Sequence, residues 1–257
     1  MRIGEGTVVL VTGGASGLGE SVVRKMHALG CSVCVADMNK ERMELITKEL
    51  GKERVLTVEC NVTKEADVEA AVKKTVEKFG ALHVALACAG VAWPSMTLTS
   101  KGSLDMKSFE NLFAINVFGS AYTAKYAAVA MSKNKAVNDL GEKGVIIFVS
   151  SVAAEEGQRG QVAYGGSKGA INGMVMPMAR DLSKFGIRVA AIAPGIFMTP
   201  MGHAMPKKVL DELMTNTPMG RPGQPEEFAH FVGAIIENSY INGVHLRIDG
   251  AIKMGNL

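Results

Sequence analysis

The sequence predicts an α/β fold, a doubly wound seven-stranded parallel sheet with helices on both faces. Short apolar, β-branched segments alternate along the 257 residues with longer stretches that have helical periodicity. Most of the short segments are apolar at every position, which is typical of strands that are covered by helices on both sides. Because crossovers between such strands are right-handed, we predict the strand order 3-2-1-4-5-6-7 within a single domain, residues 1–257.

The predicted elements follow in order from the N-terminus. The strands lie at residues 7–11, 32–36, 55–59, 84–87, 145–149, 188–192 and 244–248. Among the connecting helices, 20–29 and 67–79 place apolar residues at helical spacing, and 226–237 follows Pro225, which favours the first turn of a helix. Ligands of such a sheet bind beyond the carboxyl ends of the strands, so we expect the functional motifs there.

Composition excludes several classes of protein. Apolar residues make up 47% of the chain and charged residues 21%, as in ordinary globular proteins. The net charge of +3 is too small for a strongly basic nucleic-acid-binding surface, and no apolar run reaches the ~18 residues of a membrane span. We therefore expect neither direct nucleic-acid binding nor a membrane segment. The cysteines, including Cys31 and Cys34 near an apolar strand, lack metal-ligand spacing, so we predict no metal site.

A glycine-rich turn follows the first strand and opens a helix, which is the context that a dinucleotide-binding loop needs. Gly13, Gly17 and Gly19 form the pattern G-x-x-x-G-x-G. Glycines allow a tight turn and a close approach of the backbone to a pyrophosphate, while the helix N-terminus attracts its negative charge. The pattern predicts a Rossmann-type dinucleotide site.

A carboxylate at the end of the second strand predicts which dinucleotide binds. Asp37 lies eighteen residues after Gly19, where it can accept hydrogen bonds from the ribose hydroxyls of NAD and repel the extra phosphate of NADP. The glycine-rich turn contains no Arg or Lys, and Lys40 is the one cation close by. We predict NAD as the cofactor. The alternative role for Asp37 is that of a turn or helix-capping residue.

Three polar residues after the fifth strand predict proton-transfer chemistry. Tyr164 and Lys168 are four residues apart, a spacing that places both on one face of a helix. A tyrosine with a pKa near 10 is a poor base, and a neighbouring ammonium group is expected to lower that pKa. Ser151 can hydrogen-bond the substrate oxygen. Asn116, in the helical segment 113–120, is expected to hold a water that relays protons to Lys168, through its side chain or through the backbone it distorts.

Together these motifs resemble the short-chain dehydrogenase/reductases over the whole chain. The matching elements are TGGASGLG, Asp37, Cys88-Ala89-Gly90, Asn116, Ser151, Tyr164-x-x-x-Lys168 and Pro194-Gly195. The resemblance implies that Ser151, Tyr164 and Lys168 form a catalytic triad with Asn116 as a fourth member. It also implies cofactor contacts from Ser16 and Leu18 to the pyrophosphate, Val62 to the adenine, Cys88 to the ribose, and Phe197 and Thr199 to the nicotinamide.

Segments such as SVAAEEGQRGQVAYGGSKG and RIDGAIKM are similar to the dehydrogenases of 3-hydroxyacyl-CoA within that family. This similarity implies an NAD-dependent, homotetrameric, mitochondrial enzyme that acts on acyl-CoA or on another apolar alcohol or ketone, steroids included. The sequence shows no presequence, so the alternative location is the cytoplasm. Asn61 stands where the family usually has an Asp beside the adenine. Gly165 and Gly166 replace bulkier residues, which predicts a loosened helix start.

Substrate selection is expected to depend on a lid at about residues 197–220. This segment contains five methionines, which suit an adaptable apolar cover; the alternative is a plain surface helix with a methionine-rich underside. Lys207 and Lys208 are candidates for contacts with CoA phosphates, or else they are simply solvated. The last helix and the strand 244–248 form a sheet edge that needs protection, and in this family such an edge pairs with another subunit.

Two other functions are compatible with these residues. One is a 3-oxoacyl carrier-protein reductase with the same mechanism, against which Asp37 argues because those reductases usually prefer NADPH. The other is a non-catalytic Rossmann scaffold that serves as a subunit of an RNA-processing complex. The presence of Ser151, Tyr164 and Lys168 argues against a purely structural role.

Overall fold

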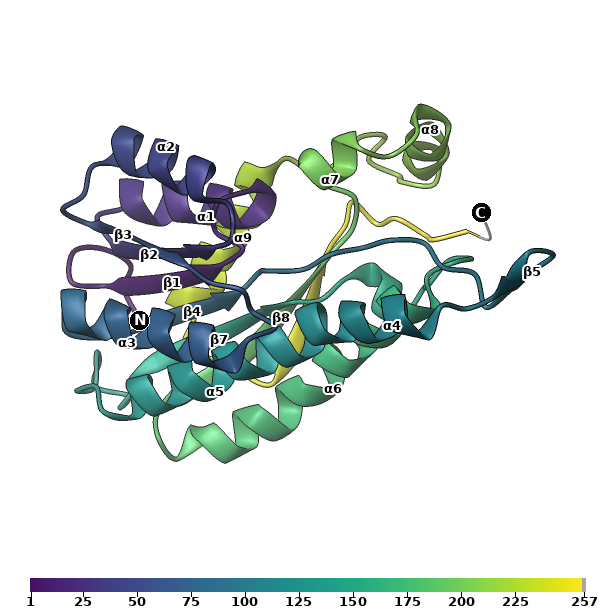
Figure 1. Cartoon of the computed structure of the whole chain (residues 1–257). Helices are drawn as coiled ribbons and strands as arrows, with labels where there is room; N and C mark the ends of the chain where they lie inside the picture. Colours follow the sequence, from purple (N-terminus) through teal and green to yellow (C-terminus); the bar gives the residue numbers. More distant parts are fainter. Residues whose placement is uncertain (256–257) are drawn as a thin grey trace.

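The computed structural model describes residues 1–255 and contains a large sheet with helices on both of its faces (Figure 1). All seven strands are parallel and run in the order β3-β2-β1-β4-β7-β8-β9. This confirms the predicted order, because β5 and β6 belong to a separate hairpin. The strands are β1 (Val8–Thr12), β2 (Ser32–Asp37), β3 (Val55–Glu59), β4 (Val84–Ala87), β7 (Gly144–Val149), β8 (Ile187–Pro194) and β9 (Val244–Ile248).

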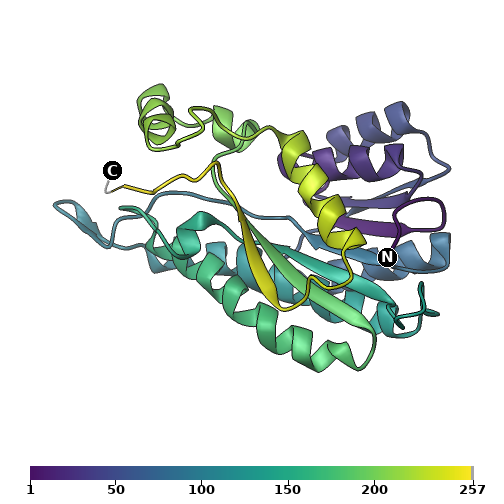
Figure 2. The same cartoon turned by 180° about the vertical axis from the view of Figure 1, so that it is seen from behind.

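Three helices cover each face of the sheet (Figures 1 and 2). One layer consists of α1 (Gly17–Ala28), α2 (Lys40–Leu50) and α9 (Pro225–Glu237). The other consists of α3 (Glu65–Phe79), α5 (Gly119–Ser132) and α6 (Val162–Ser183). Within residues 1–255, no helix has the length and apolar character that a membrane crossing requires.

The central strand β1 shows why the strand sequences are uniformly apolar. Successive side chains of a strand point to opposite faces. Val9 and Val11 therefore pack in the core cluster that includes α1 and α9, whereas Leu10 packs in the cluster that includes α3 and α5. All three side chains are fully buried. A strand with helices on both faces has no position for a polar side chain, so period-2 alternation is missing from the sequence.

Element boundaries differ from the predicted ones by a few residues. The first strand lies at Val8–Thr12 rather than 7–11. The helix predicted from residue 20 begins at Gly17, because the glycine-rich turn itself supplies the first helical turn. The segment 113–120, predicted as one helix, contains the end of α4 (Met106–Phe113), a π-helical turn at Ala114–Phe118 and the start of α5.

Several smaller elements gather on one side of the sheet, where the strands end (Figure 1). They include α4 and a two-stranded hairpin of β5 (Leu98–Thr99) and β6 (Gly102–Ser103), which the sequence analysis did not predict. The predicted lid segment contains α7 (Pro200–His203) and α8 (Lys207–Thr215). The chain after β9 runs back toward these elements, so they border the expected ligand site together (Figure 2).

A buried ion pair joins the far ends of β7 and β8. The Arg188 guanidinium donates to the Glu142 carboxylate at 2.7 Å, and its side chain is 7% exposed. The same guanidinium donates to the backbone carbonyls of Ile235, Ile236 and Ile241, which end and follow α9. All three guanidinium nitrogens donate hydrogen bonds inside the protein, which offsets the cost of burying the charge and anchors α9 to the sheet.

We expect Arg188→Met to lower the free energy of unfolding by about 3–5 kcal/mol, because the buried Glu142 carboxylate keeps the Met1 ammonium but loses the guanidinium, and carbonyls at the end of α9 lose a donor. Arg24 is the matched control: it pairs with Glu20 and Glu49, but its side chain is 39% exposed. Arg24→Met should cost less than about 1 kcal/mol, since exposed ion pairs contribute little. Urea unfolding measures both values, and equal losses in the two variants would contradict the anchoring role of Arg188.

Candidate active site

The glycine-rich turn packs so closely against neighbouring backbone that side chains have no room in it. A Cβ atom on Gly13 would lie 2.7 Å from the Cα atom of Ala89, and Gly13 has a positive φ of 66°. A Cβ atom on Gly19 would collide with the Gly13 carbonyl oxygen. Ser16 is exposed at the N-terminus of α1, and its hydroxyl makes no capping bond there, while Leu18 packs against the core. This arrangement fits a pyrophosphate held by backbone N–H groups.

Asp37 braces this turn and remains half-exposed. Its Oδ2 atom accepts a hydrogen bond from the Ala15 N–H at 3.0 Å, and its Oδ1 atom accepts one from the Asn39 N–H at 3.0 Å. A carboxylate has roughly four lone-pair sites, so both oxygens keep the capacity to accept a ribose hydroxyl. The role as a turn residue and the role as a ribose ligand are therefore compatible in one side chain.

The cations near Asp37 are held in ion pairs. The Nζ atom of Lys40 lies 2.8 Å from Glu59, and the Arg42 guanidinium lies 2.6 Å from Glu20. Lys40 is the cation that could attract the extra phosphate of NADP. Its charge is already compensated by a carboxylate of β3 in this structure.

Asn61 and Val62 border the predicted adenine site. The Asn61 side-chain oxygen accepts hydrogen bonds from the backbone N–H and the hydroxyl of Thr63, at 3.0 and 2.7 Å. The side-chain oxygen is thus occupied. The amide nitrogen of Asn61 can donate hydrogen bonds to the adenine, whereas an Asp carboxylate could only accept them. Val62 is 7% exposed and packs against Gly119, on which a Cβ atom would come within 2.8 Å.

The loop after β4 contributes Cys88, Ala89 and Gly90. The Ala89 N–H donates a 3.5 Å bond to the Thr12 hydroxyl, which links this loop to the end of β1. Burial raises the pKa of the Cys88 thiol to about 12, so the thiol stays neutral at physiological pH. A Cβ atom on Gly90 would lie 3.6 Å from the Lys168 Nζ atom, so the loop reaches the predicted catalytic lysine.

The structure brings Ser151, Tyr164 and Lys168 together at the end of β7. Ser151 caps the 3-10 turn Val152–Ala154 by accepting a bond from the Ala153 N–H at 3.1 Å. Tyr164 lies in the first turn of α6, near the Ser151 side chain, which acts to lower the pKa of the phenol. Lys168 follows one turn later, with its Nζ atom 5.7 Å from the centre of the Tyr164 ring.

The pKa values of this group differ from the expectation. Burial raises the pKa of Tyr164 above its usual value, and the neighbouring Ser151 side chain only partly opposes this effect. Burial also lowers the pKa of Lys168 to about 8. The prediction that Lys168 lowers the pKa of Tyr164 is wrong for this structure. The ammonium group instead donates to the Val149 carbonyl at 2.8 Å and makes no hydrogen bond to Tyr164 within residues 1–255.

Asn116 is completely buried, and its side chain is occupied by the protein. Its oxygen accepts a bond from the Val91 N–H at 2.9 Å, and its amide nitrogen donates to the Val91 carbonyl at 3.0 Å and the Ser167 hydroxyl at 3.1 Å. The side chain therefore clamps the loop after β4 to α6. The Asn116 backbone carbonyl, in the π-helical turn, accepts a bond from the Ser120 hydroxyl at 2.7 Å and keeps a second lone pair, so the predicted role through the backbone stays available.

Some residues after β8 pack in the core, and others lie at the candidate site. Pro194 ends β8, and the Gly195 N–H donates to the Ile248 carbonyl at 3.0 Å. Phe197 is 7% exposed, and its ring packs edge-on against Phe228 with centroids 6.1 Å apart. The ring of Phe197 therefore belongs to the core, and the contact of this residue with the nicotinamide stays a prediction. Thr199, in contrast, lies beside the glycine-rich turn, 3.2 Å from where a Cβ of Gly17 would stand.

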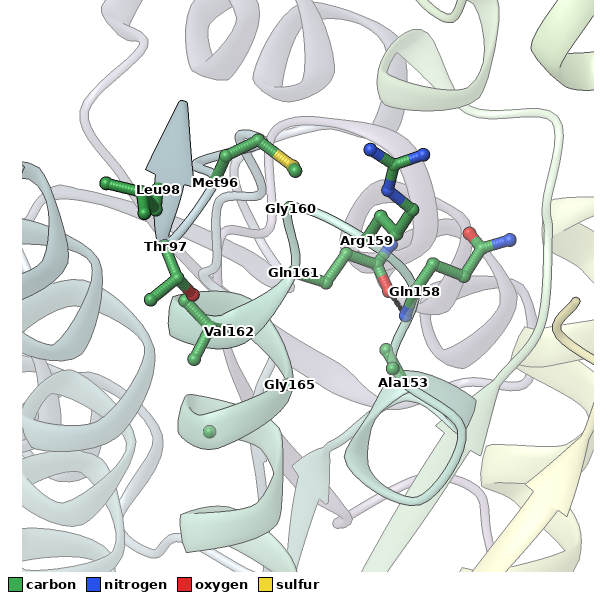
Figure 3. Close-up of a pocket in the computed structure, with 12 residues that line it drawn as sticks. Met96, Thr97, Leu98, Ala153, Gln158, Arg159, Gly160, Gln161, Val162 and Gly165 are labelled. Carbon is green, nitrogen blue, oxygen red and sulfur yellow. Dashed lines mark hydrogen bonds between the residues drawn. The ribbon is translucent and has the colours of Figure 1, made fainter. Parts of the chain in front are cut away.

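A pocket of about 500 Å³ opens at the start of α6 (Figure 3). Ala153 and Gly165, which follow Ser151 and Tyr164 closely in the chain, lie at its base, while Met96 and Arg159 face each other across its top. Sequence reasoning missed this pocket because its walls come from the hairpin region and from the loop 157–162, which are far apart in the chain. The glycines at 157 and 160 were the only local signal of a turn there.

Gly165 explains how α6 comes so close to the 3-10 turn. A Cβ atom at this position would lie 2.8 Å from the Ala153 carbonyl oxygen, whereas one on Gly166 would make an ordinary 3.6 Å contact with the Phe113 ring. The helix begins at Val162, before both glycines. The prediction of a loosened helix start is wrong, because the missing side chain at 165 tightens the contact.

Comparisons with known proteins decide the family. A family model described as enoyl-(acyl carrier protein) reductase matches residues 13–252. Relatives named 3-hydroxyacyl-CoA dehydrogenase type-2 from Bos taurus and Homo sapiens are 43% and 42% identical over 253 residues, which are 97% of this chain and 96% of theirs. The chain belongs to the short-chain dehydrogenase/reductase family. The resemblance found in the sequence is thereby confirmed.

Solved structures of short-chain dehydrogenases/reductases share the whole fold. A 3-hydroxyacyl-CoA dehydrogenase type-2 from Mycobacterium avium is 35% identical, with a TM-score of 0.92 and 100% coverage of both chains. A 7α-hydroxysteroid dehydrogenase complexed with NADH and 7-oxo glycochenodeoxycholic acid is 26% identical, with a TM-score of 0.89 and coverage of 100% and 97%. As a member of this family, the protein is an oxidoreductase that uses a nicotinamide cofactor.

We expect Gly165→Ala to lower the free energy of unfolding by about 1–3 kcal/mol, because α6 must move away from the Ala153 carbonyl. The movement displaces Tyr164 relative to Ser151, so ketone reduction should slow as well. Gly166→Ala is the matched control and should be neutral or slightly stabilising, since it removes a helical glycine without a clash. Urea unfolding and initial rates test both variants; equal behaviour would refute the importance of the Gly165 contact.

Proposed function

We propose that this short-chain dehydrogenase/reductase uses NAD to interconvert a 3-hydroxyacyl-CoA and the corresponding 3-oxoacyl-CoA. The observation that carries the proposal is the 43% identity, over nearly the full length of both chains, with a relative named for this activity. The pocket at the start of α6 supports it, because Met96, Leu98 and Val162 give it an apolar wall suited to a long flexible substrate.

The choice of NAD over NADP rests on the charges around Asp37. The carboxylate would hold the ribose hydroxyls, and it would repel a phosphate at the same position. Lys40 and Arg42, which could attract that phosphate, already pair with Glu59 and Glu20. Gly13, Gly17, Gly19 and Ser16 would hold the pyrophosphate at the N-terminus of α1, with Asn61 and Val62 beside the adenine.

The bound nicotinamide ring supplies the carbon that accepts or donates the hydride. Tyr164 exchanges the proton: in reduction its hydroxyl protonates the substrate oxygen, and in oxidation it takes that proton back. Ser151 donates a hydrogen bond to the same oxygen. The raised pKa keeps Tyr164 protonated at neutral pH, which suits the reductive direction.

Lys168 and Asn116 would resupply the proton. A lysine with a pKa of about 8 gains and loses a proton easily near neutral pH. The Asn116 backbone, in its π-helical turn, would hold the water through which Lys168 exchanges protons with solvent. Lys168 would also hold the nicotinamide ribose, together with Cys88, Ala89 and Gly90. Pro194, Gly195 and Thr199 would border the nicotinamide.

Lid, assembly and location complete the proposal. The methionines of residues 197–220 would cover the acyl chain; Met205 and Met214 pack against a small cluster of Val152, Leu213 and Ile252.

The strand β9 lies at the edge of the sheet and would pair with another subunit in a homotetramer. A mitochondrial location follows from resemblance alone, and cell fractionation would test it.

One second function deserves a direct comparison. A structure named 3-ketoacyl-(acyl-carrier-protein) reductase from Brucella melitensis, complexed with NADH, is 27% identical to this chain with a TM-score of 0.84. A carrier-protein thioester therefore belongs in the substrate assays. A purely non-catalytic scaffold is disfavoured by the grouping of Ser151, Tyr164 and Lys168.

We expect Tyr164→Phe to lower kcat for acetoacetyl-CoA reduction by about 10²–10⁴-fold, because the proton donor is lost. NADH affinity, measured by fluorescence titration, should change little, since the ring remains. Tyr126→Phe is the matched control, as the Tyr126 hydroxyl bonds Glu65 on α3. Near-normal turnover of Tyr164→Phe would refute the assignment of the proton donor.

We expect Asp37→Asn to reduce the ratio of kcat/KM for NADH to that for NADPH by about tenfold or more. The substitution keeps the shape of the side chain and removes the negative charge that repels the NADP phosphate. Glu44→Gln, an exposed substitution on α2, removes the same charge as a control. Initial rates with both cofactors give the ratio. An unchanged ratio in Asp37→Asn would show that another residue selects the cofactor.

A further inference from the structure

We infer that Arg159 recognises a phosphate on the carrier arm of the thioester substrate, and so deepens the proposed function, on which this inference rests. The arm would run from the reacting carbonyl through the pocket of Figure 3 to the Arg159 guanidinium. The chemical class recognised is the phosphopantetheine phosphate, which CoA and acyl carrier protein share.

The pocket has two chemically different walls. One wall is apolar and consists of Met96, Leu98 and Val162. Met96 lies just before β5, and Leu98 begins it. The side chains of Leu98 and Val162 are 73% and 47% exposed. The opposite wall is the loop 157–161, which carries Gln158, Arg159 and Gln161 (Figure 3). An apolar wall beside polar groups suits a ligand with an alkyl arm and a charged end.

Two of the three polar side chains on that loop are occupied within the protein. The Gln161 side-chain oxygen accepts a hydrogen bond from the Gln158 N–H at 2.9 Å, drawn as a dashed line in Figure 3. The Gln158 amide donates to the Gly255 carbonyl at 3.3 Å. These bonds fix the shape of the loop, and they leave Arg159 as the charged group that a ligand can meet.

Arg159 lacks a carboxylate partner within residues 1–255, although two acids lie just before it in the chain. Glu156 pairs with Arg247 at 2.7 Å, and Glu155 pairs with His245 at 2.9 Å. Arg247 is held in place by Asp249 as well, at 2.6 Å. The acids of this loop thus lie within ion-pair distance of Arg247 on β9, whereas Arg159 has no such partner within residues 1–255.

The position of Arg159 relative to the proposed chemistry explains what it would bind. Ala153 and Gly165, which follow Ser151 and Tyr164 closely in the chain, lie at the base of the pocket, and the guanidinium lies at its top (Figure 3). A thioester whose carbonyl is at Tyr164 would extend its carrier arm into this pocket, past Met96. A guanidinium binds phosphate through charge-assisted, bidentate hydrogen bonds, so Arg159 would engage the first anionic group of that arm.

The test compares three thioesters of one acyl group in steady-state reduction. Acetoacetyl-CoA and acetoacetyl carrier protein contain the phosphate, and S-acetoacetyl-N-acetylcysteamine ends before it. For Arg159→Gln we expect KM to rise about five- to tenfold for the first two and to stay unchanged for the third, with kcat within about twofold throughout. The wild-type kcat/KM values for CoA and carrier protein identify which source the site prefers.

Two further variants and a binding measurement separate the outcomes. Arg159→Lys should recover part of the affinity, and Arg180→Gln, an exposed substitution near the end of α6, should behave like the wild type. Titration of the NADH-loaded enzyme with CoA alone should show about fivefold weaker binding to Arg159→Gln. A uniform KM change for all three thioesters, or unchanged CoA affinity, would overturn the role of Arg159. A wild-type enzyme that reduces no thioester would refute the proposed function, while the CoA titration would still decide on Arg159.

Discussion

The attachment of α6 to the end of β7 is the interaction on which the site depends. Lys168 is held from two sides: its Nζ atom donates to the Val149 carbonyl at 2.8 Å, and its own carbonyl accepts a bond from the Ser150 hydroxyl at 3.2 Å. Gly165 lets the helix reach the turn that Ser151 caps. Because β7 is buried along most of its length, this attachment transfers the rigidity of the sheet to the proposed proton donor.

Burial has opposite effects on the two titratable groups of the site. It stabilises the protonated phenol of Tyr164 and the neutral amine of Lys168, and so raises one pKa and lowers the other. The same low-dielectric surroundings strengthen hydrogen bonds made to the substrate oxygen. A protonated tyrosine beside an easily titrated lysine is an arrangement suited to ketone reduction, in which one proton is delivered and then replaced.

Local patterns in the sequence sufficed for the sheet order, the glycine-rich turn and the grouping of Ser151, Tyr164 and Lys168. Side-chain environment was harder to predict, because it depends on contacts between distant segments. Phe197 belongs to the core since Phe228 of α9 lies against it, and the Asn116 side chain is occupied since Val91 lies within reach. The pocket and Arg159 were missed for the same reason. A hairpin and a loop about 60 residues apart in the sequence form its walls.

Hydride transfer to a 3-oxoacyl thioester is the central claim, and an isotope experiment tests it most directly. The enzyme would be incubated with acetoacetyl-CoA and NADH that carries deuterium at both C4 positions, and the product analysed by mass spectrometry. We predict 3-hydroxybutyryl-CoA with one deuterium on C3, formed faster than with similarly labelled NADPH. A product without deuterium, or no product while the labelled NADH remains bound, would contradict the claim.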